Sequence, residues 1–114
     1  MPTDKFIFYG FLSKTAGNKR DKLEELKKQS TTAILYEGIH RLESTIELIG
    51  DVFGSNHEVY VGLELTKKFE KHIHGKVEKV LKTIDEIQKS RGSDIKGEAT
   101  IVIGIIINET FIFT

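Results

Sequence analysis

The sequence contains no cysteine, no tryptophan and only one proline in 114 residues. The absence of cysteine excludes disulfides, thiolate nucleophiles, and thiolate ligands for zinc or an iron–sulfur cluster. The longest apolar run, residues 101–107, is much shorter than the ~20 residues that a membrane-spanning helix needs. The first five residues show no apolar signal-peptide core. We therefore expect a soluble, cytoplasmic protein.

Net charge is also absent, because 17 basic side chains balance 17 acidic ones. Overall charge therefore gives no argument for a nucleic-acid partner. Locally, basic side chains outnumber acidic ones over residues 1–30 and 64–91. Solvated helix faces are the ordinary explanation of such segments, and contact with a polyanion is the alternative. No linker, repeat or low-complexity segment is visible, so we expect a single domain over residues 1–114.

Hydrophobic periodicity alternates between the strand and the helix pattern along the chain. Leu42, Ile46 and Ile49, for example, recur at steps of four and three residues, which is typical of an amphipathic helix. The alternation predicts an α/β fold with a mixed, mostly parallel sheet and flanking helices. The predicted strands are 6–12, 31–36, 58–65 and 98–107, the predicted helices are 19–29, 40–53 and 76–90, and residues 110–114 are a candidate edge strand.

Several familiar kinds of site are missing. A glycine-rich phosphate loop needs several glycines after the first strand, and here Gly10 is followed only by Gly17. No serine-centred elbow is present. His72 and His74 have the wrong spacing for two ligands on one helix face, although on a strand they would share a face. We therefore predict no metal site.

Two predicted strand ends carry the best candidate residues, because ligands of α/β proteins gather at the carboxyl ends of strands. The first end brings Glu37, His40 and Arg41 together around a glycine turn. An equally weighted alternative is that His40 and Arg41 merely open a helix and pair with nearby glutamates. The second end is residues 64–68, where Thr66 could simply cap the following turn. A third feature, residues 96–98, precedes the last core strand and could be only a turn.

These segments also form an ordered set of short motifs. They are Pro2-Thr3-Asp4, Phe6-Ile7-Phe8-Tyr9-Gly10-Phe11-Leu12, Tyr36-Glu37 with His40-Arg41-Leu42, Phe53-Gly54, Glu64-Leu65-Thr66-Lys67-Lys68-Phe69-Glu70, Gly75 and Lys96-Gly97-Glu98. In this order they resemble the C-terminal domain of the tetrapyrrole (corrin/porphyrin) methylase family of S-adenosylmethionine-dependent enzymes, in its branch acting on small-subunit ribosomal RNA. The chain departs from the family pattern at Ser13, Gly38-Ile39 and Leu63, where the family has proline, Ser-Pro and arginine.

The resemblance implies a mixed sheet of about five strands and a two-domain methylase with its cofactor between the domains. The N-terminal cofactor domain is not part of this chain, so we expect the chain alone to be inactive. The implied substrate is the 2′-oxygen of a cytidine ribose in ribosomal RNA. The alternatives are a non-catalytic RNA-binding or interaction module, and a domain of a small-molecule tetrapyrrole methylase. An apolar tail at residues 111–113 and an unpartnered surface further predict a homodimer.

The resemblance also implies roles for individual residues. The S-adenosylmethionine site would use Tyr36, Gly38, Val61, Gly62 and Leu63. The general base would be one of Glu37, His40 and Lys67. Contacts to RNA phosphates would come from Lys14, Lys19, Arg20, Arg41 and Lys68.

Overall fold

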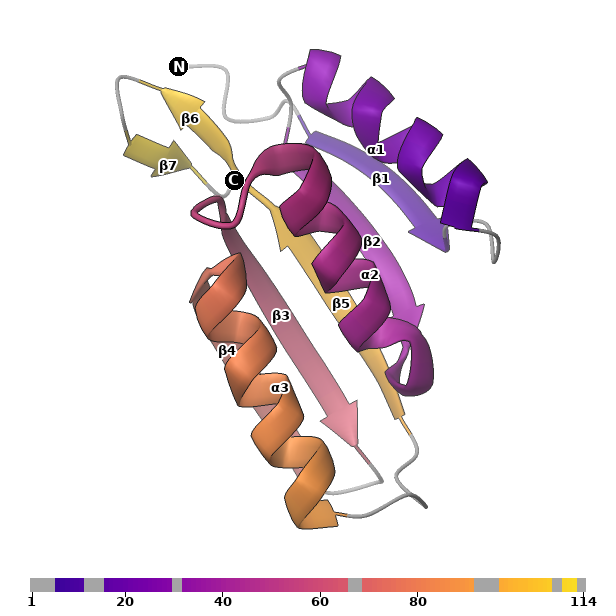
Figure 1. Ribbon diagram of the computed structural model, residues 1–114, viewed down its shortest axis with the longest axis vertical. Coiled ribbons are helices and arrows are strands. Elements are labelled where there is room, and N and C mark those ends of the chain that lie inside the picture. Colours follow the sequence, from indigo (N-terminus) through magenta and orange to yellow (C-terminus); the bar gives the residue numbers. More distant parts are fainter. Residues whose placement is uncertain are drawn as a thin grey trace.

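A mixed sheet with helices packed on one face forms the body of the molecule (Figure 1). The computed structural model describes residues 6–11, 16–29, 32–65, 69–91, 97–107 and 110–112. Its elements are β1 (Phe6–Phe11), α1 (Ala16–Gln29), β2 (Thr32–Gly38), α2 (Ile39–Phe53), β3 (Glu58–Leu65), β4 (Phe69–Lys76), α3 (Val77–Arg91), β5 (Gly97–Ile103), β6 (Ile105–Ile107) and β7 (Thr110–Ile112). The predicted α/β class and the sheet of five strands are confirmed.

The strands lie in the order β1-β2-β5-β3-β4. Only β1 and β2 pair in parallel, whereas β2–β5, β5–β3 and β3–β4 are antiparallel. The prediction of a mostly parallel sheet is therefore wrong. The reason is that β5, the last strand of the sheet in sequence, lies between β2 and β3 and runs against both. Helix α2 still joins two strands of the same direction, but they are not neighbours (Figure 1).

Strand β4 is the element that the periodicity missed. It forms a hairpin with β3 and pairs along its whole length, from Leu65 opposite Phe69 to Glu58 opposite Lys76. Its sequence, FEKHIHGK, is mostly polar, and among its described side chains only that of Ile73 is buried. An edge strand with one open face tolerates this composition, so its alternation is weak.

The carboxyl-terminal strands also differ from the prediction. The expected strand 98–107 is divided at Gly104 into β5 and β6. The candidate strand at residues 110–114 appears as β7, which pairs with β6 rather than with the edge of the main sheet. Residues 113 and 114 lie outside the described part of the chain.

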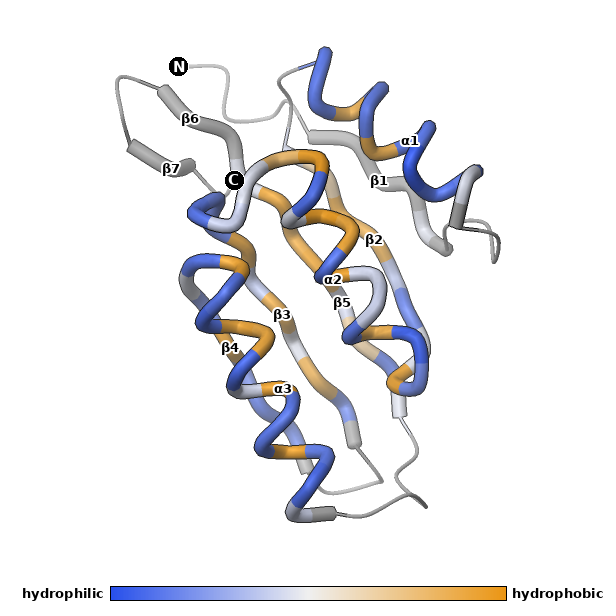
Figure 2. Tube along the Cα trace, in the orientation of Figure 1, coloured by the Kyte–Doolittle hydropathy of each residue, from blue (hydrophilic) through white to orange (hydrophobic). Residues whose placement is uncertain are grey.

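The core lies between the helices and one face of the sheet. Every second residue of the central strands points into it, including Leu35, Val61 and Ile101, each fully buried. Helix α2 contributes Leu42 and Ile46 from the face turned toward the sheet. In Figure 2 hydrophobic positions alternate with hydrophilic ones along each of the three helices, as expected for amphipathic helices on a core.

The opposite face of the sheet is not covered by any described helix (Figure 1). Residues that alternate with the core positions lie there, among them Tyr36, Tyr60 and Thr100. Antiparallel sheets commonly leave one face to solvent in this way. Side chains on this face are therefore available to a ligand.

Candidate functional site

The candidate segments at the strand ends are far apart in the sequence, and they meet at one end of the sheet. Gly38 at the end of β2 pairs with Glu98 at the start of β5, and Glu98 pairs with Glu64 near the end of β3. Glu64 pairs in turn with Glu70 in β4. These residues form a continuous row across four strands. Segments that are up to 60 residues apart thus form one site, because β2 and β3 finish at the same end of the sheet.

A hollow of about 510 Å³ lies beside this row, on the open face. The adjacent row of the sheet runs through Tyr36, Thr100, Gly62 and His72. Because Gly62 has no side chain, the surface is depressed between the larger residues on either side. The hollow is lined by Tyr36, Tyr60, Gly62, Leu63, Glu64, Glu70, His72, Glu98, Ala99 and Thr100.

Tyr60 and His72 form one wall of the hollow. The hydroxyl of Tyr60 hydrogen-bonds to Nδ1 of His72, and in the tautomer protonated on Nε2 the hydroxyl is the donor. Their rings are stacked, with centroids 5.7 Å apart and planes inclined by 29°. A Cβ at Gly62 would lie 3.5 Å from the Tyr60 ring. Any larger side chain at position 62 would therefore occupy the hollow.

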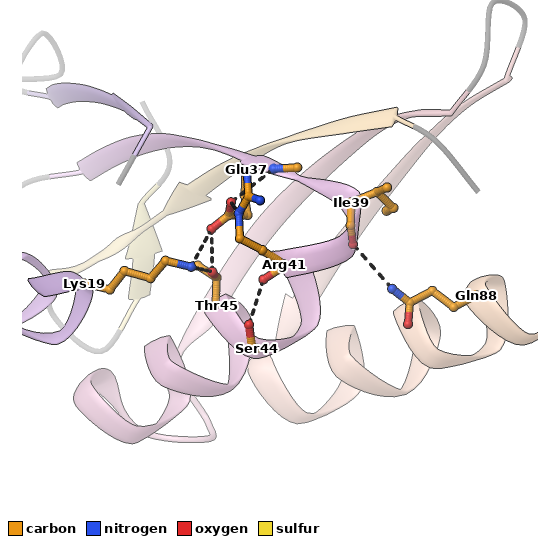
Figure 3. A network of polar contacts seen from close by, with 8 residues as sticks. Lys19, Glu37, Ile39, Arg41, Ser44, Thr45 and Gln88 are labelled. Atoms are coloured by element: carbon orange, nitrogen blue, oxygen red, sulfur yellow. Dashed lines mark hydrogen bonds and ion pairs between the residues drawn. The ribbon is translucent and has the colours of Figure 1, made fainter. Parts of the chain in front are cut away.

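Glu37 lies on the other face of β2, in the buried network of Figure 3. Its Oε1 accepts hydrogen bonds from Nζ of Lys19 at 2.9 Å and from the hydroxyl of Thr45 at 2.6 Å. Its Oε2 accepts from Nε of Arg41 at 3.0 Å and from the backbone N–H of Gly38 at 3.1 Å. The carboxylate thus connects α1, α2 and the end of β2.

The electrostatics of this network follow from its contacts. Burial by itself raises the pKa of Glu37, but hydrogen bonds from Thr45 and Lys19, the charge of Lys19 and the hydrogen bond from Arg41 lower it below its ordinary value of 4.5. A carboxylate with a lowered pKa and four donors is a poor proton acceptor. The geometry therefore favours a positioning role for Glu37 over the predicted role of general base.

Some of the other predicted site residues are buried, and others line the hollow. Lys19 is buried, with 7% of its side chain exposed, so its predicted contact with RNA phosphates does not fit the structure. Val61 is fully buried on the helix side, so only its backbone could reach a ligand on the open face. Tyr36, Gly62 and Leu63, predicted for the cofactor, are all among the residues that line the hollow, and the side chain of Leu63 is buried like that of Val61.

The remaining candidates lie at the periphery. His40 is exposed at the start of α2, next to Arg41, whose side chain is 44% exposed. Arg20 is exposed on α1, 3.6 Å from Asp51. Three further predicted residues lie outside the described part of the chain, namely Lys14, Lys67 and Lys68. Within the described ranges no group of three or more His, Asp or Glu side chains is arranged to hold a metal ion.

The sequence reasoning missed Tyr60, His72 and Thr100 as site residues. Their register beside Gly62 arises from pairing between distant strands, so local periodicity gives no signal for it. The spacing of His72 and His74 was a partial signal, because side chains two apart share a face on a strand.

Comparison with known proteins identifies the family. A family model described as tetrapyrrole (corrin/porphyrin) methylases matches residues 2–81. The chain belongs to this family. The ribosomal RNA small subunit methyltransferase I of Bacillus subtilis is 39% identical over 98 residues, which are 86% of this chain and 31% of that protein. Its counterpart in Mycoplasmopsis pulmonis is 38% identical over 100 residues, 88% of this chain and 41% of that protein.

A solved structure shows the same fold. Cobalt precorrin-4 methyltransferase, a cobalamin biosynthetic enzyme, superposes with a TM-score of 0.55 at 19% identity, over 91% of this chain and 42% of that one. The family resemblance of the sequence motifs is thus confirmed. The chain spans between 31% and 41% of the two methylase relatives named above. No helix among the described residues of this family member is long and apolar enough to cross a membrane.

Proposed function

We propose that this chain forms one wall of the cofactor cleft of an S-adenosylmethionine-dependent methyltransferase. The observation that supports the proposal is the convergence of three family motifs, which contribute Tyr36, Glu64 and Glu98, on a single hollow. Clefts lined by aromatic residues with a few polar groups are the usual form of a small-molecule site. The other wall would come from the domain that the curated relatives contain in addition.

The residues of the hollow fit an adenosyl group. The exposed ring of Tyr36 and the paired Tyr60 offer planar faces for a purine. Leu63 borders the hollow, and Gly38 lies in the next row of the sheet. When bound, S-adenosylmethionine supplies a methyl group on a positively charged sulfur. The residues named here would orient the adenosyl part.

The acceptor follows from the relatives named ribosomal RNA small subunit methyltransferase I. We propose a ribose 2′-hydroxyl of a cytidine in that RNA, methylated in the cytoplasm. Arg20 and Arg41 are exposed cations that remain suitable for phosphates, together with Lys14 and Lys68. His40 and Lys67 remain the candidate bases, because Glu37 is fully engaged.

Two alternatives make different predictions. A non-catalytic RNA-binding or interaction module is favoured by one observation, namely that Leu63 is buried where the family pattern has an arginine. Such a module would bind RNA but leave the hollow empty. A domain for a small tetrapyrrole is less favoured, because the acidic side chains in the hollow would repel the carboxylates of that ligand.

The test is a titration of the isotope-labelled chain with S-adenosylmethionine, followed by amide chemical shifts. We expect shifts at Tyr36, Gly62 and Leu63 with millimolar or weaker affinity, because only one wall of the cleft is present. Each ~1.4 kcal/mol of lost contact weakens binding tenfold. A methyl-transfer assay on ribosomal subunits with this chain alone should give no product. Shifts confined to α1, or no shifts even at ligand concentrations well above millimolar, would refute the proposal.

A further inference from the structure

Among the described residues, the charged side chains that line the hollow are all acidic. Three carboxylates line it, those of Glu64, Glu70 and Glu98, and no lysine or arginine is among its described lining residues. The three glutamates occupy directly paired positions on β3, β4 and β5. Neighbouring strands are about 4.8 Å apart, so the carboxylates are close enough to repel one another. A positive charge in the hollow would relieve that repulsion.

The aromatic walls are an independent feature with the same preference. Tyr36 and Tyr60 both line the hollow, and the face of an aromatic ring carries the negative side of its quadrupole, which attracts organic cations. The hydrogen bond and the stacking with His72 hold the Tyr60 ring over Gly62. The wall is thus fixed before any ligand arrives, which lowers the entropic cost of binding.

We propose that the hollow recognises the positive charge of its ligand, so that it binds S-adenosylmethionine in preference to S-adenosylhomocysteine. The proposal rests on the proposed function and adds a selectivity to it. The two molecules share the adenosyl group and differ by the methyl group, which gives the sulfur of the first its positive charge. A hollow that contacted only the purine would bind S-adenosylmethionine and S-adenosylhomocysteine equally. The carboxylates Glu64, Glu70 and Glu98 supply the distinction.

The experiment compares ligands on the complete chain. The isotope-labelled protein is titrated with S-adenosylmethionine, S-adenosylhomocysteine and adenosine, at low salt and at high salt. Exposed ion pairs are individually weak, so the three carboxylates together give a preference of about tenfold for the charged ligand at low salt. Screening at high salt should reduce this preference, because the Debye length falls to about 3 Å at 1 M ionic strength.

Two variants assign the effect to the hollow. Glu64→Gln combined with Glu98→Gln removes charge at nearly constant shape, and should lower the preference to about twofold. Glu86→Gln, on the exposed face of α3, makes the same chemical change outside the hollow and should leave the preference unchanged. The amide spectrum of each variant shows directly whether the fold is retained.

The outcomes separate the two proposals. Equal binding of both cofactor forms at Gly62 and Leu63, or a preference that survives the double substitution, would overturn the charge selectivity and leave the cofactor wall in place. Absence of binding by every adenosyl ligand would overturn the proposed function and the selectivity with it. A preference that is lost in the double variant and retained in Glu86→Gln would support both.

Discussion

The buried contact between Lys19 and Glu37 makes a quantitative prediction about stability. Lys19→Met keeps the apolar stem of the side chain and removes its ammonium group. Glu37, with 5% of its side chain exposed, then loses the donor 2.9 Å from Oε1 and keeps Arg41 on Oε2. Removing one partner of a buried ion pair costs about 3–5 kcal/mol. Because Arg41 still neutralises the carboxylate, we expect about 3 kcal/mol, the lower end of that range.

Urea unfolding followed by circular dichroism measures this loss. With a slope of about 2 kcal/mol per molar urea, 3 kcal/mol lowers the midpoint by about 1.5 M. Lys22→Met is the matched control, because Lys22 lies on the same helix and its contact with Glu25 is exposed and 3.9 Å long. The control should cost less than about 1 kcal/mol.

The double variant Lys19→Met with Glu37→Gln tests the electrostatic reasoning itself. It removes both buried charges and leaves only the half-exposed guanidinium of Arg41, so it should recover part of the loss. A double variant whose loss equals the sum of the two single losses would show that the charges do not interact. Equal losses for Lys19→Met and Lys22→Met would refute the claim that burial decides the cost.

Three further predictions follow from other features. The His57 ring contacts the carbonyl oxygen of Gly104 at 2.7 Å, and burial lowers the pKa of His57 below 6.5. Unfolding therefore takes up a proton, so the free energy of unfolding should fall as the pH drops below 6.5. Urea titrations at several pH values measure this fall, which should be smaller in His57→Gln. Gly62→Val should abolish the shifts caused by adenosyl ligands while the amide spectrum stays folded, whereas undiminished binding would place the ligand elsewhere. Light scattering should show a homodimer, and a monomer at high concentration would contradict this.

The helices and the central strands could be predicted because each contains a strong local pattern. Leu42, Ile46 and Ile49 all lie on the face of α2 that packs on the sheet, so periodicity alone locates that helix. Strand β4 lacks such a pattern, because Ile73 is its only described side chain that is buried. An element could therefore be predicted from the sequence where its buried residues recur regularly, and not from strand propensity alone.

The candidate site was predictable in its parts and not in its assembly. The motifs located Tyr36, Glu64 and Glu98 at or near strand ends, but their proximity depends on the insertion of β5 between β2 and β3. The burial of Glu37 could not be predicted either, because one of its partners, Lys19, is 18 residues away on α1. Contacts between residues so far apart depend on the whole fold, and no local sequence pattern predicts them.

The position of β5 also has a consequence for the order of folding during synthesis. The central strand of the sheet is made after β1 to β4, at elongation rates of about 5–20 residues per second. Until residues 97–103 leave the ribosome, β2 and β3 each present an unpaired edge, and the gap between them must stay open. The sheet therefore closes late, and nascent chains that end before Gly97 should be the species most dependent on chaperones.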